Sequence, residues 1–287
     1  MFLSDRLRNS RVLRKPLLKF ARWVWGQIVD GPGVVRRAFY DAMPGPYGLA
    51  SHVEHFVVST GDRVIGRELF LRGEFDFAKL VSALDIVRSK GYPSPRHLID
   101  VGANIGSITI PAINRGLMES ATAIEPHPDN LRLLLANIAL NGMVDKVTAL
   151  PHAVGSESGA CLLLEESAHS SGNHSIGSSG VPVRSVCLDD LDFPDGCLLW
   201  MDIEGYEGHA LAGGRRLLAL GTPVVSEFNP AFLEKSGGLE LFREALAGRH
   251  LYDLETPGDA ETTFDAIIQR LAGKPDRDRW TDILALP

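Results

Sequence analysis

The stretch that most constrains the fold runs from residue 97 to residue 106 and reads HLIDVGANIG. Its first half is apolar and partly β-branched, which predicts a buried strand of a parallel sheet. Gly102 and Gly106 then open a tight turn and let a ligand approach, because glycine has no Cβ. Isoleucines continue at helical spacing, so the stretch predicts a strand, a glycine turn and a helix. Glu125 ends the next apolar run, where a carboxylate can accept hydrogen bonds from a ribose.

Two kinds of cofactor compete for such a turn. A dinucleotide requires the pattern G-x-G-x-x-G, because the following helix N-terminus must cradle a pyrophosphate. Here Asn104 replaces the middle glycine, and Asp100 lies two residues before Gly102. A carboxylate repels a pyrophosphate but attracts the sulfonium and amino groups of S-adenosylmethionine (SAM). The residues therefore favour SAM, and the remaining interpretation is a glycine turn of an unrelated α/β protein.

The charge of the chain is unevenly distributed. The net charge is -7, whereas residues 1–40 carry nine Lys and Arg against two Asp, so this segment holds +7 and the rest -14. An acidic main body argues against a dedicated nucleic-acid-binding protein. Three cysteines without C-x-x-C spacing indicate free thiols in a reducing compartment. With no apolar run long enough to span a bilayer and no signal-peptide core, we expect a cytoplasmic protein.

The organisation predicted from the sequence is a basic helical extension, residues 1–49, followed by one domain, residues 50–287. Residues 1–30 predict an amphipathic helix, flanked by Trp23 and Trp25, whose apolar face holds Leu17, Phe20, Ala21, Val24 and Ile28. One interpretation is a helix that lies on a membrane surface, since basic residues and tryptophan favour anionic headgroups. The other, which we expect, is a helix docked on its own domain or on a partner subunit.

Apolar runs and helical patterns alternate through the domain. Buried strands are expected at residues 98–101, 121–125, 147–154, 198–203 and 222–228, with an antiparallel edge at 283–286 and a hairpin within 53–72 that turns at 60–62. This alternation predicts a doubly wound, mainly parallel α/β sheet with its site at the carboxyl ends of the strands. Residues 206–220 are expected to form a helix, and strands are expected at 161–164 and 181–188, on either side of a polar loop at 165–180. This loop is too long for a plain connection and is expected to be functional or mobile.

Taken together, these motifs resemble the FkbM family of SAM-dependent methyltransferases over roughly residues 57–230. The similar segments are DVGANIG (100–106), IEPHPDN (124–130), NIALN (137–141), LDDL (188–191), MDIEGYE (201–207) and SEF (226–228). The resemblance implies a class I methyltransferase domain with a Rossmann-like fold that transfers methyl groups mostly to oxygen on sugars or natural products. One position departs from the family, which usually has Lys where this chain has Trp200.

The resemblance also implies roles for individual residues. The glycine turn would hold the methionine end of SAM and Glu125 its ribose; His127 and Asn130 would lie beside the adenosine, and Ala153 with its neighbours beside the adenine. His127 has a second interpretation as the cap of the helix that begins at Pro128. The cofactor-binding residues expected are therefore Asp100, Gly102, Asn104, Gly106, Glu125, His127, Asn130 and Ala153.

Methyl transfer from a sulfonium is an in-line displacement, so alignment and a deprotonated nucleophile are the main needs. A hydroxyl acceptor requires a general base or a metal. Asp202 is the leading base because it ends the central strand; Glu204 follows it, and His174 in the polar loop is the alternative catalytic base. Asp202 with Glu227 and Asn229 is the alternative that would hold a divalent metal. Glu207 is interpreted as a first-turn helix acid.

The sequence therefore predicts a SAM-dependent methyltransferase that O-methylates a sugar, a glycan or a natural product. The alternative is a non-catalytic SAM-binding protein or a scaffold recruited to a membrane by its N-terminal helix. A protein without catalysis would be expected to lose the carboxylates at Asp202 and Glu204, which this chain retains. We expect a small-molecule or glycan acceptor and no nucleic-acid partner.

Overall fold

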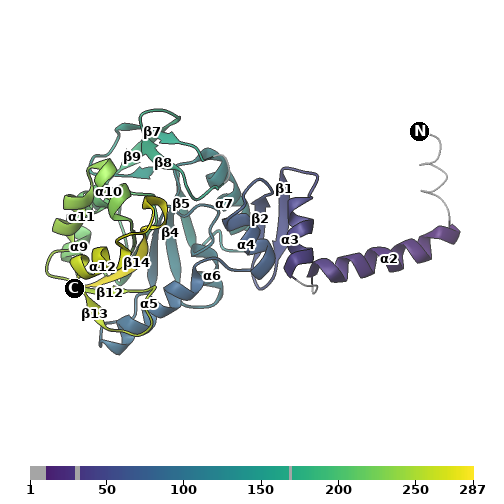
Figure 1. Ribbon diagram of the computed structural model, residues 1–287, viewed down its shortest axis with the longest axis horizontal. Coiled ribbons are helices and arrows are strands. Elements are labelled where there is room, and N and C mark those ends of the chain that lie inside the picture. The colour runs from purple at the N-terminus through teal and green to yellow at the C-terminus, as the bar shows by residue number, and fades with distance from the viewer. Residues whose placement is uncertain (1–10, 30–32, 168–169) are drawn as a thin grey trace.

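The computed structural model describes residues 11–29, 33–167 and 170–287, and a large sheet forms its centre (Figure 1). The eight strands follow the order β13-β12-β14-β11-β10-β3-β4-β5. The parallel strands are β3 (His97–Val101), β4 (Ser120–Ile124), β5 (Val147–Leu150), β10 (Cys197–Met201) and β11 (Val224–Phe228). The antiparallel edge consists of β14 (Thr281–Leu286), β12 (His250–Asp253) and β13 (Glu261–Thr262).

The chain builds this sheet outward from its middle. From β3 it passes through β4 to β5 on one side, and later crosses to β10 and β11 on the other. The order therefore reverses between β3 and β10, which is the kind of switch point where doubly wound sheets open a crevice for ligands. The predicted doubly wound, mainly parallel α/β sheet is confirmed, and so is the antiparallel strand near the C-terminus.

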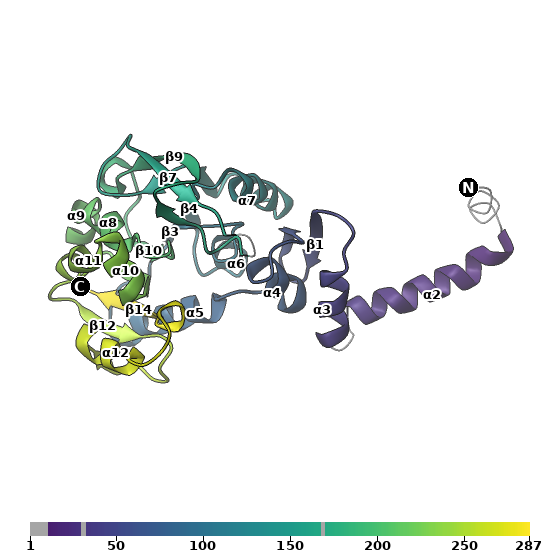
Figure 2. The same ribbon diagram turned by 45° about the horizontal axis from the view of Figure 1, so that its top comes forward.

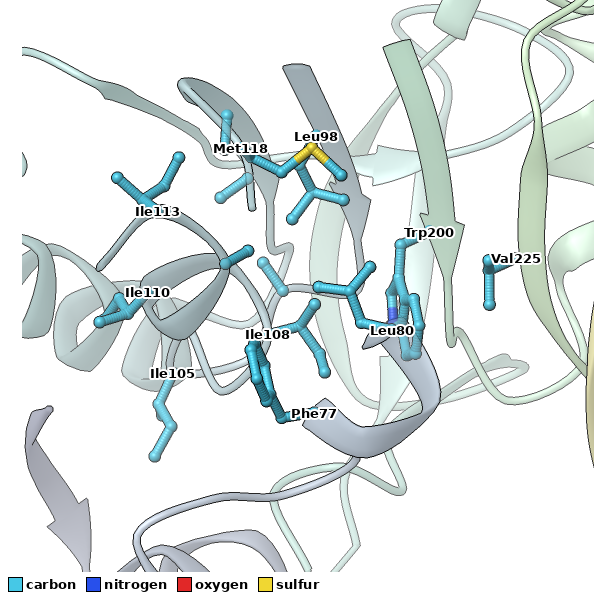
Figure 3. Close-up of a cluster of buried hydrophobic side chains, with 14 of the residues drawn as sticks. Phe77, Leu80, Leu98, Ile105, Ile108, Ile110, Ile113, Met118, Trp200 and Val225 are labelled. Atoms are coloured by element: carbon cyan, nitrogen blue, oxygen red, sulfur yellow. The ribbon is translucent and has the colours of Figure 1, made fainter. Parts of the chain in front are cut away.

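Helices cover both faces of the sheet because its central strands are apolar on both sides. Leu98 and Trp200 pack under α5 and its neighbours (Figure 3). Ile99 and Leu199 pack on the opposite face. The first layer contains α5 (Phe77–Ser89), α6 (Thr109–Asn114) and α7 (Pro128–Leu140). The second contains α8 (Glu207–Ala212), α9 (Arg215–Ala219), α10 (Pro230–Ser236), α11 (Leu239–Ala245) and α12 (Phe264–Leu271).

The helix expected over residues 206–220 is split into α8 and α9. The break falls at Gly213, where an added Cβ would lie 2.2 Å from the carbonyl oxygen of Gly155. The backbone at Gly213 therefore lies in direct contact with the backbone of the loop at Gly155. A continuous helix with a side chain at this position would not fit.

A second, smaller sheet lies beside the carboxyl ends of the large one. Its order is β6-β9-β7-β8, with β6 (Ala153–Val154), β7 (Cys161–Glu165), β8 (Ser175–Gly177) and β9 (Val181–Val186). Strands were expected on both sides of the polar loop, and both are present. Part of that loop forms β8, which pairs antiparallel with β7 at the edge of the small sheet (Figure 1).

The segment before α5 differs from the expectation. The hairpin is formed by β1 (Tyr47–Ser51) and β2 (His55–Ser59), and residues 65–72 form the helix α4 (Ile65–Arg72). The predicted turn at residues 60–62 thus begins a helix, because the Asp62 carboxylate accepts hydrogen bonds from the backbone N–H groups of Val64 and Gly66. Tyr40 in α3 (Gly33–Asp41) is fully buried, so the packed body begins ahead of residue 50.

The first described helix, α2 (Arg11–Val29), projects away from this body (Figures 1 and 2). Its large apolar side chains are exposed, among them Leu17, Phe20 and Trp23. The large apolar side chains of α2 therefore do not pack on its own domain, which was one of the two partners expected for this helix. Within the described part of the chain, no helix is both long and apolar enough to span a membrane.

Candidate functional site

A cleft opens at the switch point of the large sheet, with an empty volume of about 850 Å³ that includes the solvent at its mouth. The ends of β3, β4 and β10 form its floor, and the small sheet forms one wall. Seven of the predicted site residues line it: Asp100, Gly102, Asn104, Glu125, Ala153, His174 and Asp202. Trp200, at the position where the resemblance implied a lysine, also lines it and is 5% exposed.

The glycine turn is shaped by protein neighbours. Gly102 has φ +85°, and an added Cβ would lie 2.1 Å from the backbone oxygen of Asp202. Gly106 has φ +92°, and an added Cβ would lie 2.8 Å from Ile110 and 3.0 Å from Leu134. Glycine is therefore required at both positions by contacts within the fold, whereas the sequence suggested the approach of a ligand as the reason.

Asp100 lies beneath this turn, almost fully buried at the end of β3. Its Oδ2 accepts a hydrogen bond of 2.5 Å from the Thr109 hydroxyl on α6. Burial raises the pKa of Asp100 to about 6, although the hydrogen bonds from Thr109 lower it. The strand end thus carries a carboxyl group whose charge a cationic ligand would favour.

Glu125, just after β4, joins the glycine turn to the start of α7. Its Oε2 accepts a hydrogen bond from the backbone N–H of Asn104 at 2.9 Å, and its Oε1 accepts one from the backbone N–H of His127 at 2.8 Å. Burial raises the pKa of Glu125 to about 7, against these hydrogen bonds, which lower it. Because a carboxylate has about four acceptor positions, two bonds leave capacity for ligand hydroxyls.

The polar loop closes over this corner of the cleft. The backbone oxygen of Ser171 accepts hydrogen bonds from the side-chain amides of Asn104, at 2.8 Å, and of Asn130, at 3.0 Å. The Ser171 hydroxyl in turn donates to Asp62 at 2.6 Å. Asn130 therefore holds the loop in place as well as facing Glu125, from which its amide nitrogen lies 3.5 Å away.

The two histidines predicted at the site lie side by side, with ring centroids 4.4 Å apart. His127 occupies the N-cap position of α7, but its side chain makes no cap hydrogen bond; its Nε2 lies 3.0 Å from Glu166. In His174, Nδ1 accepts a hydrogen bond from the backbone N–H of Ser167 at 3.0 Å, and burial lowers the pKa of the ring. A neutral His174, which lines the cleft, therefore carries its proton on Nε2, and this nitrogen is a donor.

Asp202 follows β10, and its backbone N–H donates to the Val101 oxygen at 3.1 Å, so the ends of β10 and β3 are locked together. Its side chain faces both the cleft and a second cavity. Burial raises the pKa of Asp202 well above its usual range, and the nearby carboxylates of Glu204 and Asp282 raise it further. A carboxylate with raised pKa is a stronger base near neutral pH.

The second cavity has an empty volume of about 730 Å³, open solvent included, and shares Asp202 with the cleft. Glu204 lines it in the left-handed conformation, with φ +54°. Burial raises the pKa of Glu204 to about 7, and the Glu207 charge adds to this effect. Burial likewise raises the pKa of Glu227, whose Oε2 is enclosed without a hydrogen-bond partner among the described residues. The walls of this cavity are therefore strongly acidic.

Several residues of the second cavity escaped the sequence analysis: Asp76, Lys79, Trp280 and Asp282. Lys79 on α5 pairs with Asp282 on β14 at 2.5 Å and with Asp76 at 2.9 Å. Burial by itself lowers the pKa of Lys79, but these carboxylates raise it above its ordinary value. The spacing of three residues between Asp76 and Lys79 was the only local signal of an ion pair between them. Nothing in the sequence linked either residue to β14.

The alternative metal set of Asp202, Glu227 and Asn229 is not assembled. The Asn229 side chain caps α10, where its Oδ1 accepts from the Phe232 N–H at 3.2 Å and its Nδ2 donates to the Asp276 oxygen at 3.3 Å. Across the described ranges, no three His, Cys, Asp or Glu side chains are grouped to hold a metal ion.

The Glu207 carboxylate accepts hydrogen bonds from the N–H groups of Ile203 and Gly205, which closes the turn before α8.

Comparison with known families places this site in context. The family model described as "Methyltransferase FkbM domain" matches residues 100–274, which include the glycine turn, Glu125, the polar loop and Asp202. No curated protein matches the chain at a significant level.

Solved structures show more distant similarity. A methyltransferase FkbM from Methylobacillus flagellatus KT is 18% identical, with a TM-score of 0.44 over 70% of this chain and 46% of that one, so this chain spans less than half of it. Precorrin-6y C5,15-methyltransferase from Geobacter metallireducens GS-15 is 14% identical, with a TM-score of 0.39 over 72% and 86%. TYW2 of M. jannaschii in complex with AdoMet is 10% identical, with a TM-score of 0.43 over 85% and 86%.

Proposed function

The chain belongs to the FkbM methyltransferase family, and on that premise we propose that it uses SAM to methylate a hydroxyl oxygen of a sugar, a glycan or a natural product. The class I methyltransferase fold, Rossmann-like and doubly wound, supplies the cleft at the switch point of its sheet. When bound, SAM supplies an electrophilic methyl group on a sulfonium. The observation that carries the proposal is that Asp202 lines both this cleft and the acidic cavity beside it.

The residues of the cleft fit SAM. Glu125 has acceptor capacity left for the ribose hydroxyls after its two backbone hydrogen bonds. Asp100 gives the floor a carboxylate whose negative charge would favour the ammonium and the sulfonium. The small sheet adds an apolar wall suited to an adenine ring, composed of Ala153, Val154, Leu164 and Ile176.

The second cavity is the proposed site of the acceptor. Its carboxylates can accept hydrogen bonds from hydroxyl groups, and Trp280, 37% exposed, offers a flat apolar face. The same acidic walls would repel the phosphates of a nucleic acid, which supports a small-molecule or glycan acceptor. The three cysteines are free, in keeping with a cytoplasmic location.

In this arrangement Asp202 removes the proton from the acceptor hydroxyl as the oxygen attacks the methyl group. Glu204 lies at the same cavity and its charge helps to keep the Asp202 pKa raised. His174 presents a donor at Nε2, so we assign it to holding the cofactor rather than to removing a proton.

The test is methyl transfer from labelled SAM to a panel of sugars, glycans and natural-product extracts, followed by identification of the labelled product. We expect a labelled methyl ether whose formation is lost in Asp202→Asn and kept in Glu240→Gln, an exposed carboxylate on α11. A label on nitrogen or carbon would contradict O-methylation, and failure to bind SAM would contradict the cofactor.

A further inference from the structure

The helix α2 exposes an apolar face that the packed body leaves uncovered. Leu17, Phe20 and Trp23 follow one another at helical spacing and are 55%, 61% and 61% exposed. The rings of Phe20 and Trp23 stack on each other with centroids 6.0 Å apart. Large aromatic side chains grouped on one exposed helix face mark an interaction surface.

Cations form a stripe along the same helix, beside the apolar side chains. Lys15, Lys19 and Arg22 are spaced by four and three residues, which aligns them on one side of the helix, and all three are exposed. Residues 11–29 contain five Lys and Arg and no acidic residue. A helix with a broad apolar face, a stripe of cations and no acidic residue has the composition of helices that lie in the interface of a bilayer.

The apolar exposure continues onto the elements next to α2. Val34 on α3 is 74% exposed, Leu49 on β1 is 57% exposed, and Val53 in the hairpin turn is 70% exposed. These elements form the end of the body from which α2 projects (Figure 1). One end of the molecule thus presents the apolar side chains together with the helix.

A bilayer fits both faces of α2 better than a protein groove does. A groove that covers Phe20 and Trp23 leaves the cations in water. In the headgroup region the aromatic rings enter the acyl boundary while lysine and arginine extend to the anionic phosphates. The helix is not apolar enough to cross the membrane, so it would lie in the plane of the surface.

We propose that α2 binds the surface of an anionic lipid bilayer and holds the methyltransferase domain at the membrane. Binding depends on two contributions: burial of the apolar face, and attraction of the basic face to acidic headgroups. Salt weakens the second contribution and leaves the first largely intact. The inference concerns residues outside the cleft and does not depend on the identity of the acceptor.

The test is co-flotation of the full chain with phosphatidylcholine vesicles, with and without added phosphatidylserine. We expect binding only with phosphatidylserine, and weaker binding as salt rises. Trp23→Ser should reduce binding about tenfold, since it removes buried apolar area. Leu220→Ser is the control, because Leu220 is an exposed apolar side chain, 77% accessible, at the end of α9 on the main body. Trp23 and Leu220 are both exposed, so both variants should fold and bind SAM alike.

Three results would overturn the proposal. The first is absence of vesicle binding by the full chain. The second is equal loss of binding in Trp23→Ser and Leu220→Ser, which would remove the role of the apolar face of α2. The third is a dimer in light scattering that Trp23→Ser dissociates, with vesicle binding unchanged; this would assign the face to a second copy of the chain.

Discussion

Gly102 lies directly against the backbone of Asp202: a Cβ added to the glycine would come 2.1 Å from the carbonyl oxygen of the aspartate. The two residues end neighbouring parallel strands, and the backbone N–H of Asp202 also bonds to the oxygen of Val101. The turn beneath the cleft and the proposed base are therefore held in one rigid unit, and a change in one displaces the other.

Gly102→Ala should destabilise the protein more than a positive φ alone explains. A left-handed alanine costs about 1–2 kcal/mol, and here the added methyl must also displace the Asp202 backbone. Gly116→Ala is the matched control, because Gly116 has φ +72° but open space around its Cβ position. Thermal unfolding should show a larger fall in Tm for Gly102→Ala, and equal falls would contradict the tight contact.

Glu125→Ala should weaken SAM binding by about ten- to a hundredfold, since charged hydrogen bonds contribute roughly 1.5–3 kcal/mol. It should also lower Tm, because the N–H groups of Asn104 and His127 lose their acceptor. Calorimetry with SAM measures the first effect, with Asp129→Ala, an exposed acid on α7, as the control. Tight binding of NAD and none of SAM would contradict the proposed cofactor.

Asp202→Asn should lower the rate of methyl transfer by about 10²–10⁴ and leave SAM affinity nearly unchanged, because it removes the base and keeps the shape. Single-turnover kinetics and SAM titration separate the two quantities. Near-normal turnover by the folded variant would reject Asp202 as the base. A variant that unfolds would instead show that the carboxylate supports the fold.

His174→Asn should lower kcat by less than the loss of about 10²-fold expected when a general base is removed. The reason is that the Nδ1 lone pair of His174 is already used by the Ser167 N–H, so the neutral ring cannot accept a proton without breaking that bond. We expect the KM for SAM to rise more than kcat falls. A collapse of kcat with unchanged KM would return His174 to the role of base.

Glu204→Gln should stabilise the protein at pH 8 and change little near pH 4. The pKa of Glu204 rises from 4.5 to about 7 on folding because of burial, so the folded state binds more protons than the unfolded state between these values. Stability therefore falls as pH rises through this window, and glutamine removes that loss. Tm measured from pH 4 to pH 8 should show a difference that grows in favour of the variant.

Local sequence was sufficient to predict the centre of this protein. The apolar run at 98–101, the two glycines and the periodic helix after them belong to one short segment, and such a strand with polar groups at its end has few ways to pack. The parallel order followed from the alternation of strands and helices along the chain. Asp100, Glu125 and Asp202 could be placed together because parallel strands end at the same edge of a sheet.

Tertiary structure alone decided which partners those residues meet. The hydrophobic periodicity of a segment shows which face of the helix or strand a side chain occupies, but not which distant segment covers that face. Lys79 on α5 meets Asp282 near the other end of the chain, and the lone pair of His174 is taken by a loop N–H. Asp62 begins a helix where a hairpin turn was expected, and α2 stands apart from its own domain, one of the two partners on which docking was expected. The contact between Lys79 and Asp282 depends on a close approach between segments far apart in sequence, which no local pattern encodes.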